Sequence, residues 1–597
     1  MPTPEEGPSV HPSPRPATTP DRIRGTGSKT RVSGAGHWMS TFSRLDGLAT
    51  LQPIGEYYEA VIQPGGTSGP LQPAAERVAQ CKRLARVIKE QRPSRRSLPA
   101  DTIHRFLPNR QVVSDLVTLY FATFEYCYRI LHLQSFRAEC QSCMDDPEAA
   151  ESSSLLQVLL VLTMAGPLHD DADVRSEIAE KAPVWIHIAE TWLCAPLEKS
   201  RLTLKAIQIH CLLVLSRQLH QVGADLVWIS VGALVRMAMQ MGLHQDPTFL
   251  GEASLRQKEM RRRLWYTILE MNAQAALDAG MSPMITDEDY NTLPPSNLSD
   301  QDLDDMIQDE SPNQISFQQI LARSLPLRLR ATRVINRLQA GPSYSEVLEL
   351  GNQLASACRD VATAIDQTAL ARSASQFASN FCSHLINRFL LYLHFSYAIK
   401  ATTNPLYSHS RKVCLETALD LVSFLHDDVY QRVLLRGGGM FRDIITRGAL
   451  VIFVELSSDT DERTSIFAIK RSRSRREGLL QDARRVVQYS KDRISQGDTN
   501  VRGYVFLSMM MAQAEARVNG SPVEAAIATT LNQSLETCHG ILKGMAGEGG
   551  KLSTPDVEFW ASHGMVPPEE LDVSFDSDFD ESFLDFSGSQ QWGETLF

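Results

Sequence analysis

The sequence has no apolar run long enough to cross a bilayer and no secretory leader. A transmembrane helix needs about 20 consecutive apolar residues, whereas the richest run here, Leu155 to Ala165, is interrupted by Gln157 and Thr163. The first ten residues, MPTPEEGPSV, lack the basic and apolar segments of a signal peptide. We therefore expect neither a membrane protein nor a secreted one, and the run at 155–165 predicts a buried helix.

Catalytic and metal-binding signatures are also missing. The chain has no G-x-S-x-G, H-E-x-x-H, Walker or G-x-G-x-x-G pattern. Its ten cysteines are scattered, and the one C-x-x-C pair, Cys140 and Cys143, has no second pair at zinc-ligand spacing. His210 and His220 lie in apolar stretches, where packing is commoner than metal binding. We predict reduced thiols, no catalytic residue, no metal ligand and no cofactor in this chain, and hence no enzyme.

Charge is distributed very unevenly along the chain. The net charge is −11, from 59 Lys and Arg against 70 Asp and Glu. No Lys or Arg follows Lys551, and eleven acids lie in the last 46 residues, so the preceding 551 residues are balanced. A surface that binds nucleic acid by itself needs an excess of clustered positive charge. We therefore expect the isolated chain to bind DNA only weakly.

Composition and periodicity divide the chain into four parts. Residues 1–35 are rich in Pro, Thr, Ser and Gly and are predicted to be disordered. Residues 36–100 form a lead-in with a linker and a first helix. Residues 101–545 repeat apolar side chains at spacings of three and four with almost no strand pattern, which predicts an all-α body whose polar stretch 294–312 is a surface loop. Residues 546–597 form an acidic tail that is also predicted to be disordered.

A basic cluster lies in the second half of the body. It has the sequence KRSRSRR, and its charged residues are Lys470, Arg471, Arg473, Arg475 and Arg476. Such a run is a candidate nuclear import signal or a loop that contacts nucleic acid. Short basic runs are also common in solvated loops, so the sequence leaves both interpretations open.

The most specific pattern lies between Leu226 and Pro294. It contains the strings RMAMQMGLHQD, MRRRLWY and AGMSPMITDEDYNTLP. These strings resemble the middle homology region of fungal zinc binuclear cluster transcription factors, and the similarity is good over roughly residues 25–310, with a motif core at 112–310. The matching residues, which we expect to be structural, are Arg236, Gly242, His244, Asp246, Arg262, Arg263, Trp265, Pro283, Leu293 and Pro294.

The resemblance implies a nuclear transcription regulator with a helical regulatory domain, which in this family can be pathway-specific. The family's DNA reader holds two zinc ions on six cysteine thiolates. No such array is present, because the first cysteine is Cys81 and the next is Cys127. Zinc and direct DNA binding are therefore expected only if a module lies upstream of this chain. The alternatives are a co-regulator that reaches DNA through a partner factor and, less favoured, a helical enzyme with an unrecognised site.

The acidic tail carries a regular aromatic pattern. Four phenylalanines recur every three or four residues among acids, at Phe575, Phe579, Phe583 and Phe586. Like charges keep such a segment open, and a helix formed on binding would gather its rings on one face. Acidic-aromatic segments of this kind fold on coactivators. We predict an activation domain with coactivators as partners, and we consider a homodimer as a further assembly.

Overall fold

The computed structural model describes most of the helical body. The described residues are 22–26, 29–34, 36–37, 45, 48, 51–62, 71–91, 106–194, 202–249, 251, 253–306, 316–338, 341–367, 374–457 and 466–548. Of the predicted tail, residues 546–548 belong to a helix, and residues 549–597, with Phe575, Phe579, Phe583 and Phe586, lie outside these ranges, as do residues 1–21. Within them the chain is almost entirely helical, which confirms the predicted all-α class.

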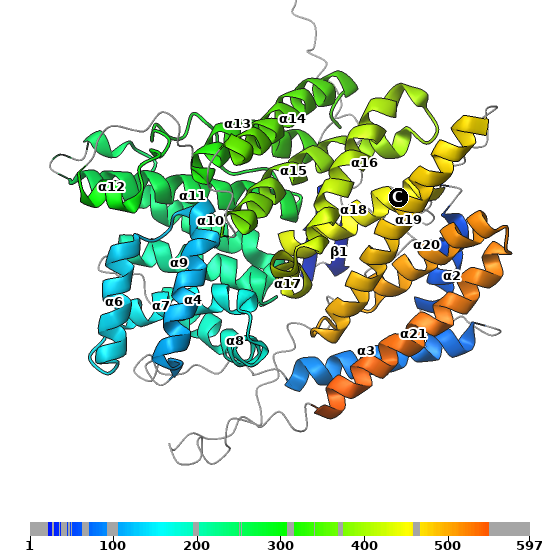
Figure 1. Ribbon diagram of the computed structural model, residues 1–597, viewed down its shortest axis with the longest axis horizontal. Helices are drawn as coiled ribbons and strands as arrows, with labels where there is room; N and C mark the ends of the chain where they lie inside the picture. Colours follow the sequence, from blue (N-terminus) through cyan, green and yellow to red (C-terminus); the bar gives the residue numbers. More distant parts are fainter. Residues whose placement is uncertain are drawn as a thin grey trace, which may run out of the picture.

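Three groups of helices follow one another along the chain (Figure 1). The first group is α4 (Arg110–Ala122), α5 (Phe124–Tyr128), α6 (Leu133–Asp145), α7 (Ser152–Ala165), α8 (Ala172–Cys194) and α9 (Leu204–Leu219). The second group is α10 (Val227–Gln240), α11 (Leu255–Ala279), α12 (Asp300–Asp304), α13 (Phe317–Ile335), α14 (Tyr344–Gln367), α15 (Ala374–Lys400), α16 (Ser408–Ser423) and α17 (Asp428–Arg436). The third group is α18 (Met440–Ser457), α19 (Ile466–Ser495), α20 (Arg502–Asn519) and α21 (Val523–Glu548).

Helix α7 is the buried centre of the first group. Its residues from Ser153 to Ala165 are all buried, as the apolar run predicted, and it packs against α4, α8 and α9. A helix that is apolar on every side needs neighbours on every side. In the second group α15 has the same position, with α13, α14 and α16 packed around it. The two groups meet where α10 and α11 of the second contact α9 of the first, and where α11 and α13 contact α5.

Local signals at the helix ends explain where the central helices begin and end. Helix α11 begins at a capping box in which Ser254 and Gln257 bond each other's backbone N–H groups. It ends at Gly280, whose φ of 68° is the left-handed conformation that glycine adopts without a steric penalty. The Gly437–Gly439 run separates α17 from α18, as expected for a cap and a helix start.

The two ends of the described chain pack together. Helices α2 (Gln52–Ile62) and α3 (Gln72–Gln91) precede the first group in sequence, yet α3 lies along α21, and α2 contacts α20 and α21 (Figure 1). Arg77 of α3 makes an ion pair with Glu536 of α21 at 2.6 Å and approaches His539 at 3.3 Å. The lead-in is therefore part of the body.

Three expectations are corrected. Residues 1–35 are not uniformly without structure, because β1 (Arg22–Thr26) and β2 (Lys29–Ser33) pair antiparallel, with Arg22 opposite Ser33. Composition alone misses this hairpin, in which position 23 lies opposite position 32, because each strand has only five residues within a segment rich in Pro, Thr, Ser and Gly. The stretch 294–312 contains α12, and the basic cluster lies in α19 rather than in a loop.

Candidate functional site

Asp246 is the centre of the family motif. Its carboxylate accepts hydrogen bonds from Nε and a terminal nitrogen of Arg262, both at 3.0 Å, and from the backbone N–H of Leu293 at 3.0 Å. Thr248 adds its N–H and its hydroxyl. Burial by itself would raise the pKa of Asp246, but these hydrogen bonds hold it far below its usual value. The ion pair ties the turn after α10 to α11, and the hydrogen bond from Leu293 ties the same turn to the residues before Pro294.

Arg263, one residue further along α11, is fully buried. It donates to Asp300 at 2.6 Å, to the carbonyl oxygen of Leu298 at 2.7 Å and to Glu259 at 3.3 Å. Asp300 also accepts from the N–H of Leu133 at the start of α6. Burial opposes ionisation of Asp300, and the charge of Arg263 lowers its pKa. Within the stretch 294–312, Asp300 is therefore partly buried, because its carboxylate neutralises the buried guanidinium of Arg263.

The remaining motif residues shape the same junction. Gly242, with a φ of 73°, ends α10 in the left-handed conformation, and the N–H of Leu243 returns to the carbonyl oxygen of Ala238 at 3.0 Å. Trp265 is fully buried, with the ring of His244 at 6.2 Å and that of Tyr290 at 5.9 Å. Three other motif residues are exposed: Arg236, which bonds its own helix, Leu293 and Pro294. Pro283 is buried.

A second buried charge network, on another face of α11, was missed by the sequence reasoning. Glu270 accepts from Arg328 of α13 at 2.5 Å, and Gln274 accepts from Arg388 of α15 at 2.7 Å. Arg388 also contacts Asp278. The signal was present, because Glu270, Gln274 and Asp278 recur every four residues in the mostly apolar second half of α11 and so share one face.

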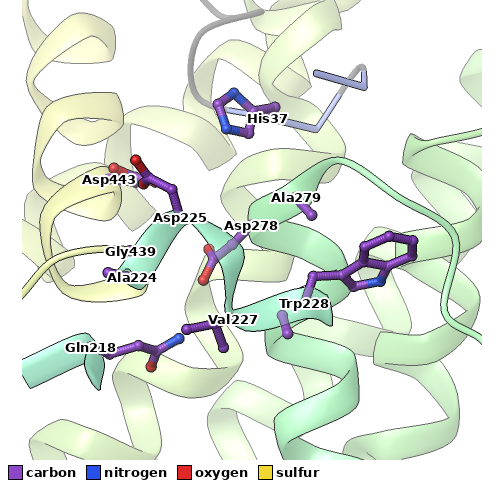
Figure 2. A pocket seen from close by; sticks show the side chains of 11 residues that line it. His37, Gln218, Ala224, Asp225, Val227, Trp228, Asp278, Ala279, Gly439 and Asp443 are labelled. Atoms are coloured by element: carbon purple, nitrogen blue, oxygen red, sulfur yellow. The ribbon is translucent and has the colours of Figure 1, made fainter. Parts of the chain in front are cut away.

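Two small cavities lie beside the start of α18. The first is lined by His37, Asp225, Asp278 and Asp443, together with Trp228 (Figure 2). Burial raises the pKa of Asp443, and the Arg442 guanidinium, which donates to it at 3.0 Å, opposes that rise. The second cavity is lined by side chains of α18, α19 and α20, including Arg493, which pairs with Asp498 at 3.0 Å. Because the carboxylates of Asp443 and Asp498 already pair with arginines, these charges stabilise the packing of the helices rather than serve catalysis.

The isolated histidines and cysteines are packing residues. His210 bonds Ser230 at 3.1 Å and His220 bonds the carbonyl oxygen of Thr163 at 2.8 Å; burial lowers the pKa of both histidines to about 4. Burial raises the pKa of the Cys140 thiol to about 11. In the part of the chain that the structure describes, no group of three or more His, Cys, Asp or Glu could hold a metal ion. The described residues therefore do not fit a zinc cluster.

The basic cluster lies near the start of α19. Arg476 donates to the carbonyl oxygen of Leu456 at 2.7 Å, and Arg475 lies 3.6 Å from Glu455, so both side chains contact α18. The structure brings together the motif residues around Asp246 and Arg263. It does not bring the basic cluster to them, and the four tail phenylalanines cannot be placed because they lie outside the described ranges.

The chain was compared with known proteins. A model of the fungal specific transcription factor domain matches residues 117–400. Transcription factor opdR of Penicillium oxalicum is 30% identical over 96% of this chain and 74% of its own length. Transcription factor asR3 of Sarocladium schorii is 32% identical over 85% of this chain and 66% of its own.

A third relative has a more specific name. The aspyridones cluster regulator apdR of Emericella nidulans is 27% identical over 68% of this chain. This chain spans 59% of the length of that protein, which is less than two thirds. Across the part that the structure describes, no helix is both long and apolar enough to span a bilayer.

Proposed function

The chain belongs to the family of fungal-specific transcription factor domain proteins, and on that premise we propose that it is a pathway-specific transcription regulator. The observation that carries the proposal is that the similarity to a transcription factor extends over 96% of the chain, well beyond the family domain. The name of the regulator from Emericella nidulans supports control of one gene cluster. The charges around Asp246 and Arg263 are paired within the body, which supports a structural role for this region in a regulatory domain.

Activation is assigned to the tail, residues 546–597. Its acids would steer it to basic coactivator surfaces, and its phenylalanines would supply apolar area of roughly 1.5–3 kcal/mol each when fully buried. The test fuses the full chain to an unrelated DNA-binding domain upstream of a reporter gene. Replacing Phe575, Phe579, Phe583 and Phe586 by Ala should abolish reporter output.

The matched control for this test changes charge instead of apolar area. The pair Asp576→Asn and Asp580→Asn should only reduce reporter output, because the other acids of the tail still repel one another and keep it open. If the chain with four alanines activates as well as the parent chain, the tail is a spacer and the activation proposal is wrong.

Nuclear import is assigned to the basic cluster on α19. The variant should combine Lys470→Ala, Arg471→Ala and Arg473→Ala and leave Arg475 and Arg476 in place, because those two contact α18. A fluorescent fusion of the triple variant should lose its nuclear enrichment. A fusion that stays nuclear would remove the cluster from consideration.

A regulator and a co-regulator differ in how they reach DNA, either through a module of their own or through a partner factor. Because no zinc-binding group is present among the described residues, the isolated chain should bind duplex DNA weakly and without sequence preference. A titration at physiological salt tests this. Tight sequence-specific binding would contradict the proposal that DNA is reached through an upstream module or a partner factor.

A further inference from the structure

The segment after the β1–β2 hairpin enters the body at one place. Gly34, Gly36 and His37, which we call the latch, are buried, and His37 is only 5% exposed. They lie between the end of α11, the end of α13 and the middle of α18, where Gly280, Asn336 and Arg447 contact them. These three contact residues define what we call the slot.

The slot binds the latch through the backbone groups of Gly36. The N–H of Gly36 donates to Oδ1 of Asn336 at 2.7 Å, and a terminal nitrogen of Arg447 donates to the Gly36 carbonyl oxygen at 3.0 Å. Asn336 is fixed in turn, because its Nδ2 donates to the carbonyl oxygen of Met281 at 3.0 Å. Both backbone groups of one residue are therefore bound by buried side chains from the body, as in sites that hold a peptide by its backbone.

The walls of the slot admit only glycine at two positions. A Cβ atom on Gly34 would overlap the carbonyl oxygen of Gly280, and one on Gly36 would come within 2.6 Å of Oδ1 of Asn336. Gly280 is equally constrained, since its Cβ would lie 2.7 Å from the carbonyl oxygen of Gly34. The peptide that fits is therefore a Gly-x-Gly segment, and the match is one of shape as well as hydrogen bonding.

Arg447 makes an empty slot unfavourable. It is 2% exposed, and its guanidinium lies 3.7 Å from the centre of the Tyr392 ring and 5.2 Å from that of Phe395. Aromatic faces attract the charge but leave the N–H groups in need of acceptors. The Gly36 carbonyl oxygen is such an acceptor. If the latch left the slot, a buried N–H group of Arg447 would lose this hydrogen bond unless water or another peptide replaced it.

The latch also contributes to the cavity shown in Figure 2, which His37 lines together with Asp225, Asp278 and Asp443. We propose that the slot formed by Gly280, Asn336 and Arg447 is a peptide-binding site for a Gly-x-Gly-His segment, that the chain's own latch fills it, and that release of the latch frees the hairpin from the body. The occupant is assigned in cis because the hairpin and latch are continuous in sequence with the lead-in that joins the body.

The first test opens the latch with one methyl group. Gly34→Ala in the full chain should expel the latch, whereas Gly55→Ala is the matched control, because no atom lies within 4 Å of the added Cβ at that position. Hydrogen exchange at the amides of Gly36 and His37 should become at least about tenfold faster in Gly34→Ala. It should be unchanged in Gly55→Ala.

Unchanged protection of α15 shows that Gly34→Ala is folded, and Gly36→Ala provides a milder second variant because its Cβ meets a side chain rather than backbone. If neither latch variant exchanges faster than the control at these amides, the slot does not hold the latch and the proposal is wrong.

The second test asks whether the slot binds peptide in trans. A fluorescent peptide with the sequence of residues 28–38 should bind the Gly34→Ala chain at least about tenfold more tightly than the parent chain, whose slot is filled. The same peptide with both glycines changed to alanine should not bind. Equal binding to both chains, or none to the opened chain, would overturn the proposal. A dimer that Gly34→Ala dissociates would overturn the assignment in cis, because a second copy would then supply the latch.

Discussion

At the scale of single residues, two buried charged side chains of the family motif each have several partners. Asp246 has five hydrogen bonds to its carboxylate from three residues, and Arg263 reaches acceptors in two separate segments. Removing one partner of such a group is costly because the other charge stays buried.

Asp246→Asn should destabilise the chain by about 3–5 kcal/mol, since it removes the charge that neutralises Arg262 while keeping the side chain's shape. Denaturant unfolding measures the change. Asp145→Asn is the control, because its ion pair with Arg110 is exposed on both sides and should have no resolvable effect. Equal effects of the two changes would mean that the motif pair is no more important than a surface pair.

Glu125 gives a prediction about pH. Burial raises its pKa to about 8, against the opposing hydrogen bonds from Tyr120 and from the N–H of Leu131. In the unfolded chain the same carboxyl ionises near pH 4.3. Between these pH values the Glu125 carboxyl keeps its proton in the folded state and has lost it in the unfolded state. The contribution of protonated Glu125 to stability is therefore complete below about pH 4.3 and is lost as the pH rises toward 8.

The variant Glu125→Gln cannot ionise and should escape this loss. Its free energy of unfolding, relative to that of the parent chain, should increase by about 1.4 kcal/mol per pH unit between pH 5 and 8 and then level off. Unfolding curves of both proteins across this range provide the measurement. A difference that does not vary with pH would show that the carboxyl is ionised in the folded state.

At the scale of elements, burial on all sides leaves α7 little tolerance for change. Leu159 is fully buried in it, between the neighbours α4, α8 and α9. Leu159→Ala should cost about 2–5 kcal/mol through lost burial and the cavity that remains. Leu338→Ala, at a leucine that is 68% exposed, should change stability by less than about 0.5 kcal/mol. Thermal unfolding of both variants tests the contrast.

At the scale of the whole molecule, helices from opposite ends of the chain close on each other. Helix α3, which lies along α21, buries Ile88 to 8% exposure, next to Val87, which is 39% exposed. A protease site inserted between α3 and α4 allows the peptide chain to be cut between the lead-in and the rest of the body. After cleavage the two pieces should still elute together, because the apolar contact remains.

In the Gly34→Ala background, in which the latch is open, Ile88→Asp should release the cleaved lead-in, because it places a charge without a partner on the buried side of α3. Val87→Asp in the same background, one residue earlier on the exposed side of the same helix, should leave the pieces together. Size-exclusion chromatography of the cleaved proteins distinguishes the outcomes. Retention of the lead-in by both variants would show that α3–α21 packing does not hold the ends together.

The sequence by itself determined the all-helical class, the buried run at 155–165, the family and the aromatic pattern of the tail, because each is a local or periodic pattern. Only the tertiary structure decided that Arg388 would meet Gln274 and Asp278, that α3 would lie along α21, and that Gly36 would reach Arg447. These partners lie more than 100 residues apart, and at such separations no periodicity or spacing links one residue to the other. The basic cluster was expected to lie in a loop for a local reason: it precedes the buried apolar residues of α19 that begin at Leu479, so its own window shows no apolar periodicity.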